Sequence, residues 1–296
     1  RHAHVRLADS PVSDCIASYD GGGIMAEHGS DVELRRSQIS DQIANCHAGH
    51  DGGAMMAEQG SILVLVDSGI SNSSAGEHGG GFSLNLNASV TLQHSSVEYC
   101  VANQSGGALF GDYDAHIRMI DSPIHHCEAG LHGGALLAEH GSDLLRSTLS
   151  DSVAVVDGGA MMAEHGSLVI LNASAISSCR AYEGGAFYVF PGARVELCEG
   201  ATITACEARR GGAMYADELS HVRLKDSPVS DCVASYDGGG IMAEHHSDVE
   251  LRHSQIANCH AGHDGGAMMA AHSSILMLID SGISNCTASY DGGAID

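Results

Sequence analysis

Apolar and polar residues alternate in short runs along the whole chain, and these runs recur at a nearly fixed interval. Residues 52–66 illustrate one unit: a Gly-Gly pair, Ala-Met-Met-Ala, a polar Glu-Gln-Gly-Ser turn, and then Ile-Leu-Val-Leu-Val. A period of two residues between Gly, Ser, Asp and Asn turns is typical of β-strands. A helical period is not evident in any window, so the pattern predicts an all-β chain.

The Gly-Gly pair recurs eleven times, most often 27 residues after the previous pair. Its first glycine is Gly21, Gly52, Gly79, Gly106, Gly133, Gly158, Gly184, Gly211, Gly238, Gly265 and Gly292. Three short strands per unit cannot bury their apolar faces alone, but coils stacked ~4.8 Å apart can. We therefore predict one continuous, single-stranded, right-handed parallel β-helix (a solenoid) over residues 1–296, with about eleven coils of ~27 residues and three strands per coil. We expect it to be a fragment of a longer repeat protein.

The strand that follows each Gly pair assigns residues to two faces. Met55 and its counterparts are always large and apolar, so we place them in the core. The next residue points outward and is large and mainly apolar in nine of ten coils, Ser83 being the exception. This stripe consists of Met25, Met56, Phe110, Leu137, Met162, Tyr188, Tyr215, Met242 and Met269. A stripe of this kind, if exposed, favours docking of another protein; the alternative is that a neighbouring turn covers it.

The coils also repeat in groups of four. The sequence His-Val-Arg-Leu at residues 4–7 returns in similar form at 116–119 and 221–224. The coils that begin at Gly52, Gly158 and Gly265 have a second strand that is apolar on both faces. The outward residues there are Ile62, Val64, Val66, Leu168, Ile170, Ile275, Met277 and Ile279. Features repeated every four coils, about 19 Å, suit a periodic or extended partner.

Residues 5–38 and 222–255 differ at only four of 34 positions, which indicates a duplication of eight coils. An active site needs one unique arrangement of side chains, so the presence of two nearly identical segments argues against an enzyme. Carboxylates are abundant, and a pair could serve glycoside hydrolysis. A lyase of this fold would combine Asp-bound calcium with Lys or Arg as the base, but Lys225 is the single lysine and nothing convergent surrounds it in the sequence.

Charge narrows the range of partners. The formal net charge is −24 with histidine neutral, and this field repels nucleic acid and anionic membranes. The longest apolar runs are too short for a membrane-spanning helix. We expect other protein subunits of an assembly as partners, or glycans, and no cofactor.

Nine cysteines form a column, each five or six residues before a Gly pair. They are Cys15, Cys46, Cys100, Cys127, Cys179, Cys206, Cys232, Cys259 and Cys286. Ser152 fills the place once, and Ser73 or Ser74 fills it in the coil of Gly79. We predict a structural ladder of buried free thiols, with disulfides between neighbouring coils as the alternative. The cysteines are evenly spaced and form no CxxC pairs, which argues against a zinc site.

Histidines form interrupted columns. One follows the outward Glu of each coil and includes His140, His165, His245 and His272, which are weak candidates for a divalent metal site. The alternative is that they are solvated turn residues.

Aromatic residues and arginines gather in one region, residues 180–218. The cluster is Arg180, Tyr182, Tyr188, Phe190, Arg194, Arg209, Arg210 and Tyr215. Such residues are favoured at interaction hot spots, so the cluster is a candidate contact site for a glycan or a partner; unspecific drift among repeats is the alternative.

The repeated Gly-Gly-Ala followed by Met, Leu or Phe resembles the GGA(I/L/V) repeats of the chlamydial polymorphic outer-membrane proteins, and similar repeats are predicted in algae and protists. The resemblance covers essentially the whole chain. The companion FxxN motif of that family is replaced by Ile-x-x-Cys or Val-x-x-Cys, as at residues 43–46. The resemblance implies a right-handed β-helix that acts in adhesion at a cell surface.

These observations lead to one functional prediction and two alternatives. We predict a non-enzymatic scaffold that docks to partner proteins through the stripe. The first alternative is a cell-surface adhesin or glycan-binding β-helix, and the second is a polysaccharide lyase or hydrolase. An extracellular, cell-surface or organelle-lumen location is favoured.

Overall fold

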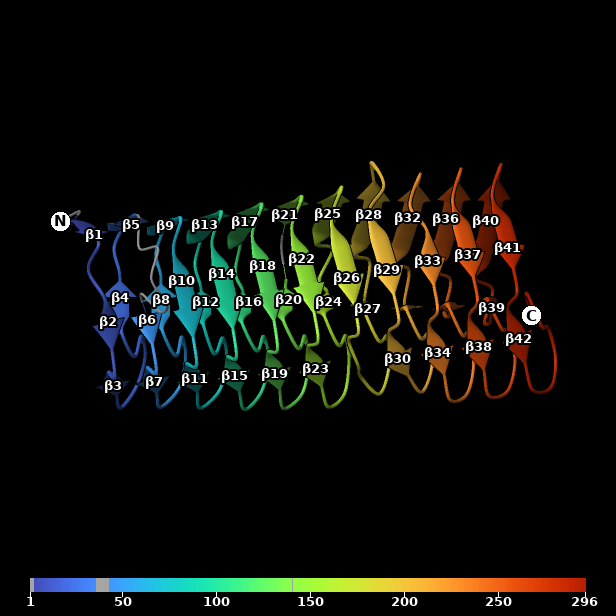
Figure 1. The fold of residues 1–296 in the computed structure, drawn as a ribbon, viewed down its shortest axis with the longest axis horizontal. Helices are drawn as coiled ribbons and strands as arrows, with labels where there is room; N and C mark the ends of the chain where they lie inside the picture. The colour runs from blue at the N-terminus through green and yellow to red at the C-terminus, as the bar shows by residue number, and fades with distance from the viewer. Residues whose placement is uncertain (1–2, 36–42, 140) are drawn as a thin grey trace.

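The computed structural model describes residues 3–35, 43–139 and 141–296. Over these residues the chain forms forty-two short β-strands and no helix. Figure 1 shows successive coils side by side along the long axis, with the two termini at opposite ends. Strands pair in parallel with their counterparts in the adjacent coils, so the chain is a β-solenoid. The eleven strands in each of two sheets mark about ten complete turns.

Four sheets run along the solenoid, and each coil passes through them in the order A, B, C, D. Sheet A contains β1 (His4–Ala8), β5 (Asp31–Arg35), β9 (Ile62–Val66), β13 (Ser89–Gln93), β17 (His116–Ile120), β21 (Ser142–Leu145), β25 (Leu168–Asn172), β28 (Arg194–Cys198), β32 (His221–Lys225), β36 (Asp248–Arg252) and β40 (Ile275–Ile279). Sheet B contains β2 (Val12–Ser13), β6 (Ile43–Ala44), β10 (Gly69–Ser71), β14 (Ser96–Glu98), β18 (Pro123–His125), β22 (Thr148–Ser150), β26 (Ala175–Ser177), β29 (Thr202–Thr204), β33 (Val229–Ser230), β37 (Gln255–Ala257) and β41 (Gly282–Ser284).

Sheets C and D complete each coil. Sheet C contains β3 (Ile16–Ala17), β7 (His47–Ala48), β11 (Ser74–Ala75), β15 (Val101–Ala102), β19 (Glu128–Ala129) and β23 (Val153–Ala154), then β30 (Glu207–Ala208), β34 (Val233–Ala234), β38 (His260–Ala261) and β42 (Thr287–Ala288). Single bridges through Arg180 join its two parts. Sheet D contains β4 (Ile24–Ala26), β8 (Met55–Ala57), β12 (Phe82–Leu84), β16 (Leu109–Gly111), β20 (Leu136–Ala138), β24 (Met161–Ala163), β27 (Phe187–Val189), β31 (Met214–Ala216), β35 (Ile241–Ala243) and β39 (Met268–Ala270).

The predicted parallel β-helix is confirmed, but each coil contains four strands rather than three. The additional strands form sheet C, and they are only two residues long. A segment of two residues has no period that the sequence could reveal. Sheets D, A and B correspond to the three predicted strands.

The core follows the predicted alternation. Met55 and its inward counterparts are fully buried in most coils, as are Leu63 and Leu65 of sheet A. Each inward residue lies above the same position of the preceding coil; Phe82, for example, lies beside Met55 in the register of sheet D. One continuous apolar column therefore fills the solenoid.

The two glycines of the repeated pair serve different purposes. Gly158 has a φ of +64°, the left-handed region that glycine enters without steric cost. Gly159 has no positive φ, but its α-carbon faces the backbone of the next coil so closely that no side chain fits. The first glycine is therefore needed for the conformation of the turn, and the second for the close approach of the backbones of neighbouring coils.

A ladder of buried serines was not predicted. At the corner between sheets A and B, the serine hydroxyl of one coil accepts a hydrogen bond from the serine backbone N–H of the preceding coil. Ser95 accepts from Ser68 at 3.2 Å, and Ser122 accepts from Ser95 at 3.1 Å. These contacts satisfy buried backbone donors at a position where the strands of a coil change direction.

Candidate functional site

The stripe predicted to be exposed on sheet D is mostly buried, so that prediction is wrong. Seven of its nine residues are at most 8% exposed, and Met269 is half-buried. Only Met25, in the first coil, reaches 38%. The buried residues are Met56, Phe110, Leu137, Met162, Tyr188, Tyr215 and Met242. Most of them form a second apolar cluster outside the main core.

Two rows of polar side chains cover the stripe. The first row comes from the turn before each Gly pair: the His78 ring stacks on Phe110 with centroids 4.3 Å apart. The second row follows each strand of sheet D: the Tyr188 hydroxyl donates to Asp217 at 3.4 Å. The neighbouring turns therefore shield the outward residues, which is the alternative that the sequence left open.

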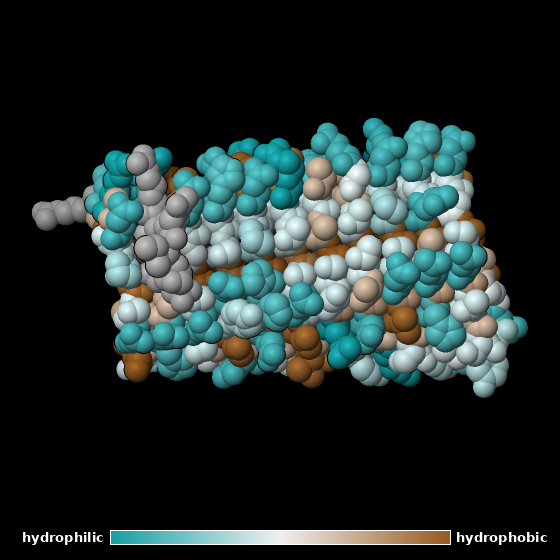
Figure 2. All heavy atoms as spheres, viewed as in Figure 1, coloured by the Kyte–Doolittle hydropathy of each residue, from teal (hydrophilic) through white to brown (hydrophobic). Residues whose placement is uncertain are grey.

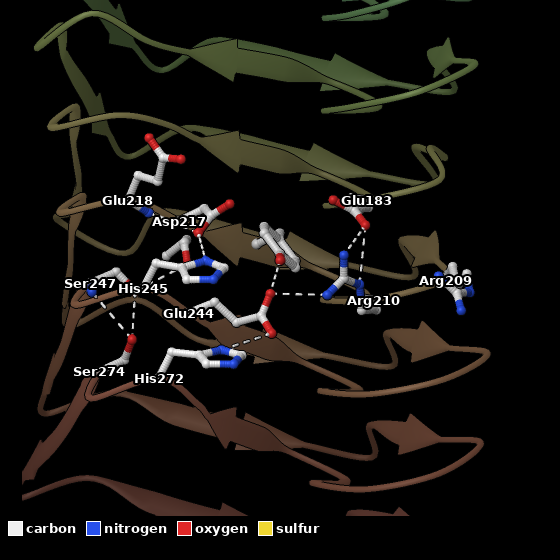
Figure 3. Close-up of polar contacts among 12 residues, drawn as sticks. Glu183, Arg209, Arg210, Asp217, Glu218, Glu244, His245, Ser247, His272 and Ser274 are labelled. Carbon is white, nitrogen blue, oxygen red and sulfur yellow. Dashed lines mark hydrogen bonds and ion pairs between the residues drawn. The ribbon is translucent and has the colours of Figure 1, made fainter.

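Arg210 joins the two rows in the second half of the chain. Its guanidinium donates to Glu183 in the first row and, at 2.9 Å, to Glu244 in the second row. It also lies over the ring of Tyr215, 4.9 Å from the centroid, while the Tyr215 hydroxyl donates to Glu244. Figure 3 shows Arg210 between the two carboxylates. Burial raises the pKa of Glu183.

The same network continues to two histidines that were weak metal candidates. His245 Nδ1 lies 2.6 Å from Asp217, and His272 Nδ1 lies 3.5 Å from Glu244. The two rings stack with centroids 4.6 Å apart (Figure 3). The hydrogen bond to Asp217 raises the pKa of His245.

The other two metal candidates lie near the middle of the chain. His165 lies beside Glu139 and Glu164, and one ligand atom of each lies within 4.8 Å of the others. Burial and the nearby carboxylate of Asp112 raise the pKa of Glu139 to about 8. His140 lies outside the described residues.

The predicted cluster in residues 180–218 is not one site, so that prediction is wrong. Alternation and turns send its members to different faces. Tyr188, Tyr215, Phe190 and Arg210 belong to the stripe and its cover. Arg194 lies on sheet A beside Glu196, and Arg180 pairs with Glu207 beside sheet C.

Tyr182 and Arg209, the remaining members, begin a ladder of planar groups. Arg209 lies over both Tyr182 and Tyr236, at 5.3 and 5.1 Å from the ring centroids. The His263 ring stacks on Tyr236 with centroids 4.7 Å apart, and it meets the tilted ring of Tyr290 at 4.6 Å. Neighbouring groups occupy the ring faces along this ladder. A sugar that stacks on an aromatic face would therefore find mainly ring edges here.

In the structure the cysteine column forms a ladder of free thiols. All ten cysteines are free, and Cys46, Cys100, Cys127, Cys179, Cys206, Cys232 and Cys259 are buried. Ser73, and not Ser74, fills the open place, because Ser73 is buried and accepts from the Cys46 N–H at 3.3 Å. Burial raises the pKa of Cys46 to about 11.

Thiol reactivity should follow this burial. At pH 8 we expect an aromatic disulfide reagent to modify at most three thiols rapidly, the partly exposed Cys15, Cys198 and Cys286. After denaturation without reductant, all ten should react. Rapid modification of more than three, or fewer than ten reactive thiols after denaturation, would contradict the free-thiol ladder.

Sheet A presents exposed apolar residues at positions that the sequence pattern predicted to face outward. Ile62, Leu168, Ile275 and Met277 are 43, 42, 54 and 47% exposed. They lie on β9, β25 and β40, four coils apart. By contrast, Figure 2 shows only a thin apolar line and separate apolar spots on the face that carries sheets B and C.

Two equivalent depressions lie on this face of sheet A. One, of about 420 Å³, is lined by Ser89, Thr91, His116, Arg118, Asp143 and Leu168. The other, of about 280 Å³, is lined by Arg194, His221, Arg223, Asp248, Glu250, Ile275 and Met277. Along the solenoid each runs from a polar coil through a His-Arg coil and an acidic coil to an apolar coil. The recurrence of the His-Arg and apolar strands was the sequence signal for this face.

No protein-family model, curated protein or solved structure matches the chain. Among the residues that the structure describes, no helix is long and apolar enough to cross a membrane.

Proposed function

We propose that this chain is a non-enzymatic scaffold that binds an extended protein partner along the outer face of sheet A. The pair of equivalent depressions, four coils apart, is the observation that carries the proposal. Because the stripe on sheet D is mostly buried, we propose sheet A as the docking face in its place.

Side-chain chemistry on sheet A supports a polypeptide partner. In the second depression His221 lies 3.3 Å from Asp248, and Arg223 donates to Glu250 at 3.0 Å. The charges of Arg223 and Glu250 offset each other next to the exposed apolar coil of Ile275. An exposed apolar surface beside paired charges suits the apolar side chains and backbone amides of a polypeptide better than it suits a highly charged ligand.

The four-coil step defines the partner further. Four coils span about 19 Å, and an extended chain advances about 3.3 Å per residue. An extended segment that lies along the solenoid would therefore place every sixth residue, approximately, over an apolar coil. We expect an apolar residue at that interval in the partner.

Peptide selection tests this proposal. Displayed peptides of about fourteen residues, selected on the wild-type protein, should carry apolar residues about six positions apart. Their affinity should fall about tenfold or more in Leu168→Asp and in the double variant Ile275→Asp with Met277→Asp, because each removes one of two linked contacts. Fluorescence anisotropy measures the affinity.

The control is Val155→Asp, an exposed apolar residue in the turn after β23, away from sheet A. It should leave the affinity unchanged. If the sheet A variants bind the selected peptides as tightly as the wild type does, the proposed docking face is wrong.

A further inference from the structure

The coil that begins at Gly79 is the one place in the stripe where a small polar residue, Ser83, replaces a large side chain. Ser83 is 0% exposed, and its hydroxyl has no hydrogen-bond partner among the described residues. His78 Nδ1 and Asn85 Oδ1, in the same coil, are also buried without a partner. Because buried polar atoms without partners are rare and costly, three in one coil indicate a ligand that the chain itself does not supply.

Ser83 and Asn85 face the same side of sheet D, since side chains alternate along a strand. The turn of Gly79 crosses directly over Ser83, because a side chain built on Gly79 would meet the Ser83 backbone nitrogen at 2.9 Å. His78 precedes Gly79, and its ring stacks on Phe110, the neighbour of Ser83 in the register of sheet D. The His78 imidazole, whose Nδ1 is buried without a partner, therefore belongs to the turn that covers Ser83.

Metal-binding groups meet at the same imidazole. Asp51, Glu77 and His78 each offer one ligand atom, and these atoms lie within 4.8 Å of one another. Asp51 accepts the His78 backbone N–H at 2.9 Å, and His50 Nδ1 lies 2.9 Å from Glu77. Such contacts to the ligand carboxylates are the type that orient the ligands of metal sites.

We propose that Asp51, Glu77 and His78 bind one divalent transition-metal ion of the zinc class. One imidazole and two carboxylates suit Zn²⁺, which commonly takes three protein ligands and a water molecule. A metal ion at this site would give the buried His78 imidazole a partner. No lysine or arginine forms an ion pair with Asp51 or Glu77 within the described residues, so the cation would also offset the negative charge.

Isothermal titration of the chelator-treated full chain with Zn²⁺ tests the site. His78→Ala is expected to remove one equivalent of bound Zn²⁺, or to weaken it on the order of 100-fold. Since His78→Ala also removes the stacking on Phe110, Glu77→Gln provides a second variant at a more exposed residue. Circular dichroism and urea denaturation establish that each variant is folded.

His132→Ala is the matched control, because His132 holds the same place before a Gly pair and pairs with Asp157, but belongs to no group of three potential metal ligands among the described residues. It should retain the equivalent that His78→Ala loses. Co²⁺ in place of Zn²⁺ should give a visible absorption spectrum that Glu77→Gln abolishes. If wild type, His78→Ala and Glu77→Gln bind the same number of Zn²⁺ ions, or if Ca²⁺ binds as tightly and independently of His78, the proposal is overturned.

Discussion

Gly159→Ala is expected to prevent normal folding or to reduce the free energy of unfolding by more than about 4 kcal/mol. A β-carbon on Gly159 would lie 2.5–2.6 Å from backbone atoms of Arg180 and closer still to the carbonyl oxygen of Gly185. These are backbone atoms of the following coil, and rotamer changes cannot relieve the clash. The two coils would have to separate, which breaks the parallel hydrogen bonds on both sides of the corner.

Gly293→Ala is the matched control for this substitution. Gly293 holds the same place in the last Gly pair, but a β-carbon there meets nothing within 4 Å. We expect its urea midpoint to stay close to that of the wild type. Equal midpoints for the two variants would show that coil-to-coil approach is not the reason for the second glycine.

Arg210→Met is expected to reduce the free energy of unfolding by about 2–4 kcal/mol at pH 7, because removing one partner leaves buried charge uncompensated. Glu183 and Glu244 are 9 and 7% exposed, and both lose their guanidinium partner. The lower end of this range allows for the partial exposure of Arg210 itself. Urea denaturation measures the difference from the wild type.

The loss should shrink as the pH falls. Burial holds the pKa of Glu183 above its ordinary value even with Arg210 present, and without Arg210 the pKa rises further. A carboxyl with a raised folded-state pKa binds its proton more readily in the folded state, so stability increases on acidification toward the unfolded-state pKa. Arg210→Met should therefore recover stability, relative to the wild type, between pH 7 and pH 5.

Arg180→Met supplies the comparison. Arg180 also bridges two coils, to Glu207, but both side chains are largely exposed. Exposed pairs contribute little, so the loss should be within about 1 kcal/mol and nearly independent of pH. Equal losses for both variants, or a deficit of Arg210→Met that grows on acidification, would contradict the account of the buried network.

The sequence predicted the solenoid and its inward residues because both depend on strict periodicity. Apolar counterparts of Met55 and Leu63 recur at a fixed place in nearly every coil, and their side chains face the core. The two-residue strands of sheet C lack such a period, as β7 illustrates. These strands lie where the Gly turns pack against the next coil, as Gly53 does against the Ser74 backbone, and the sequence pattern does not reveal such a contact.

The burial of the stripe could not be predicted from alternation, because a strand residue that faces solvent and one that faces a covering turn have the same period. Tyr215 is outward in both cases; contacts with Glu244 and Arg210 decide its exposure. One signal was available, however. Ser83 is the single small residue at the stripe position, five residues after His78. The ring of His78 covers the neighbouring Phe110, so the turn before the Gly pair was the segment to consider as a cover.

The stacking of coils has a consequence for how such a chain can change in length. Because each coil contacts mainly its two neighbours, the gain or loss of one 27-residue unit by recombination would leave every sheet continuous. It would nevertheless shift all later coils out of phase with the sheet A pattern. The near-identical segments 5–38 and 222–255 lie eight coils apart, twice the four-coil period, so this duplication kept the phase. A duplication of that size keeps the apolar and His-Arg coils of sheet A at the same four-coil spacing on both sides of the duplicated segment.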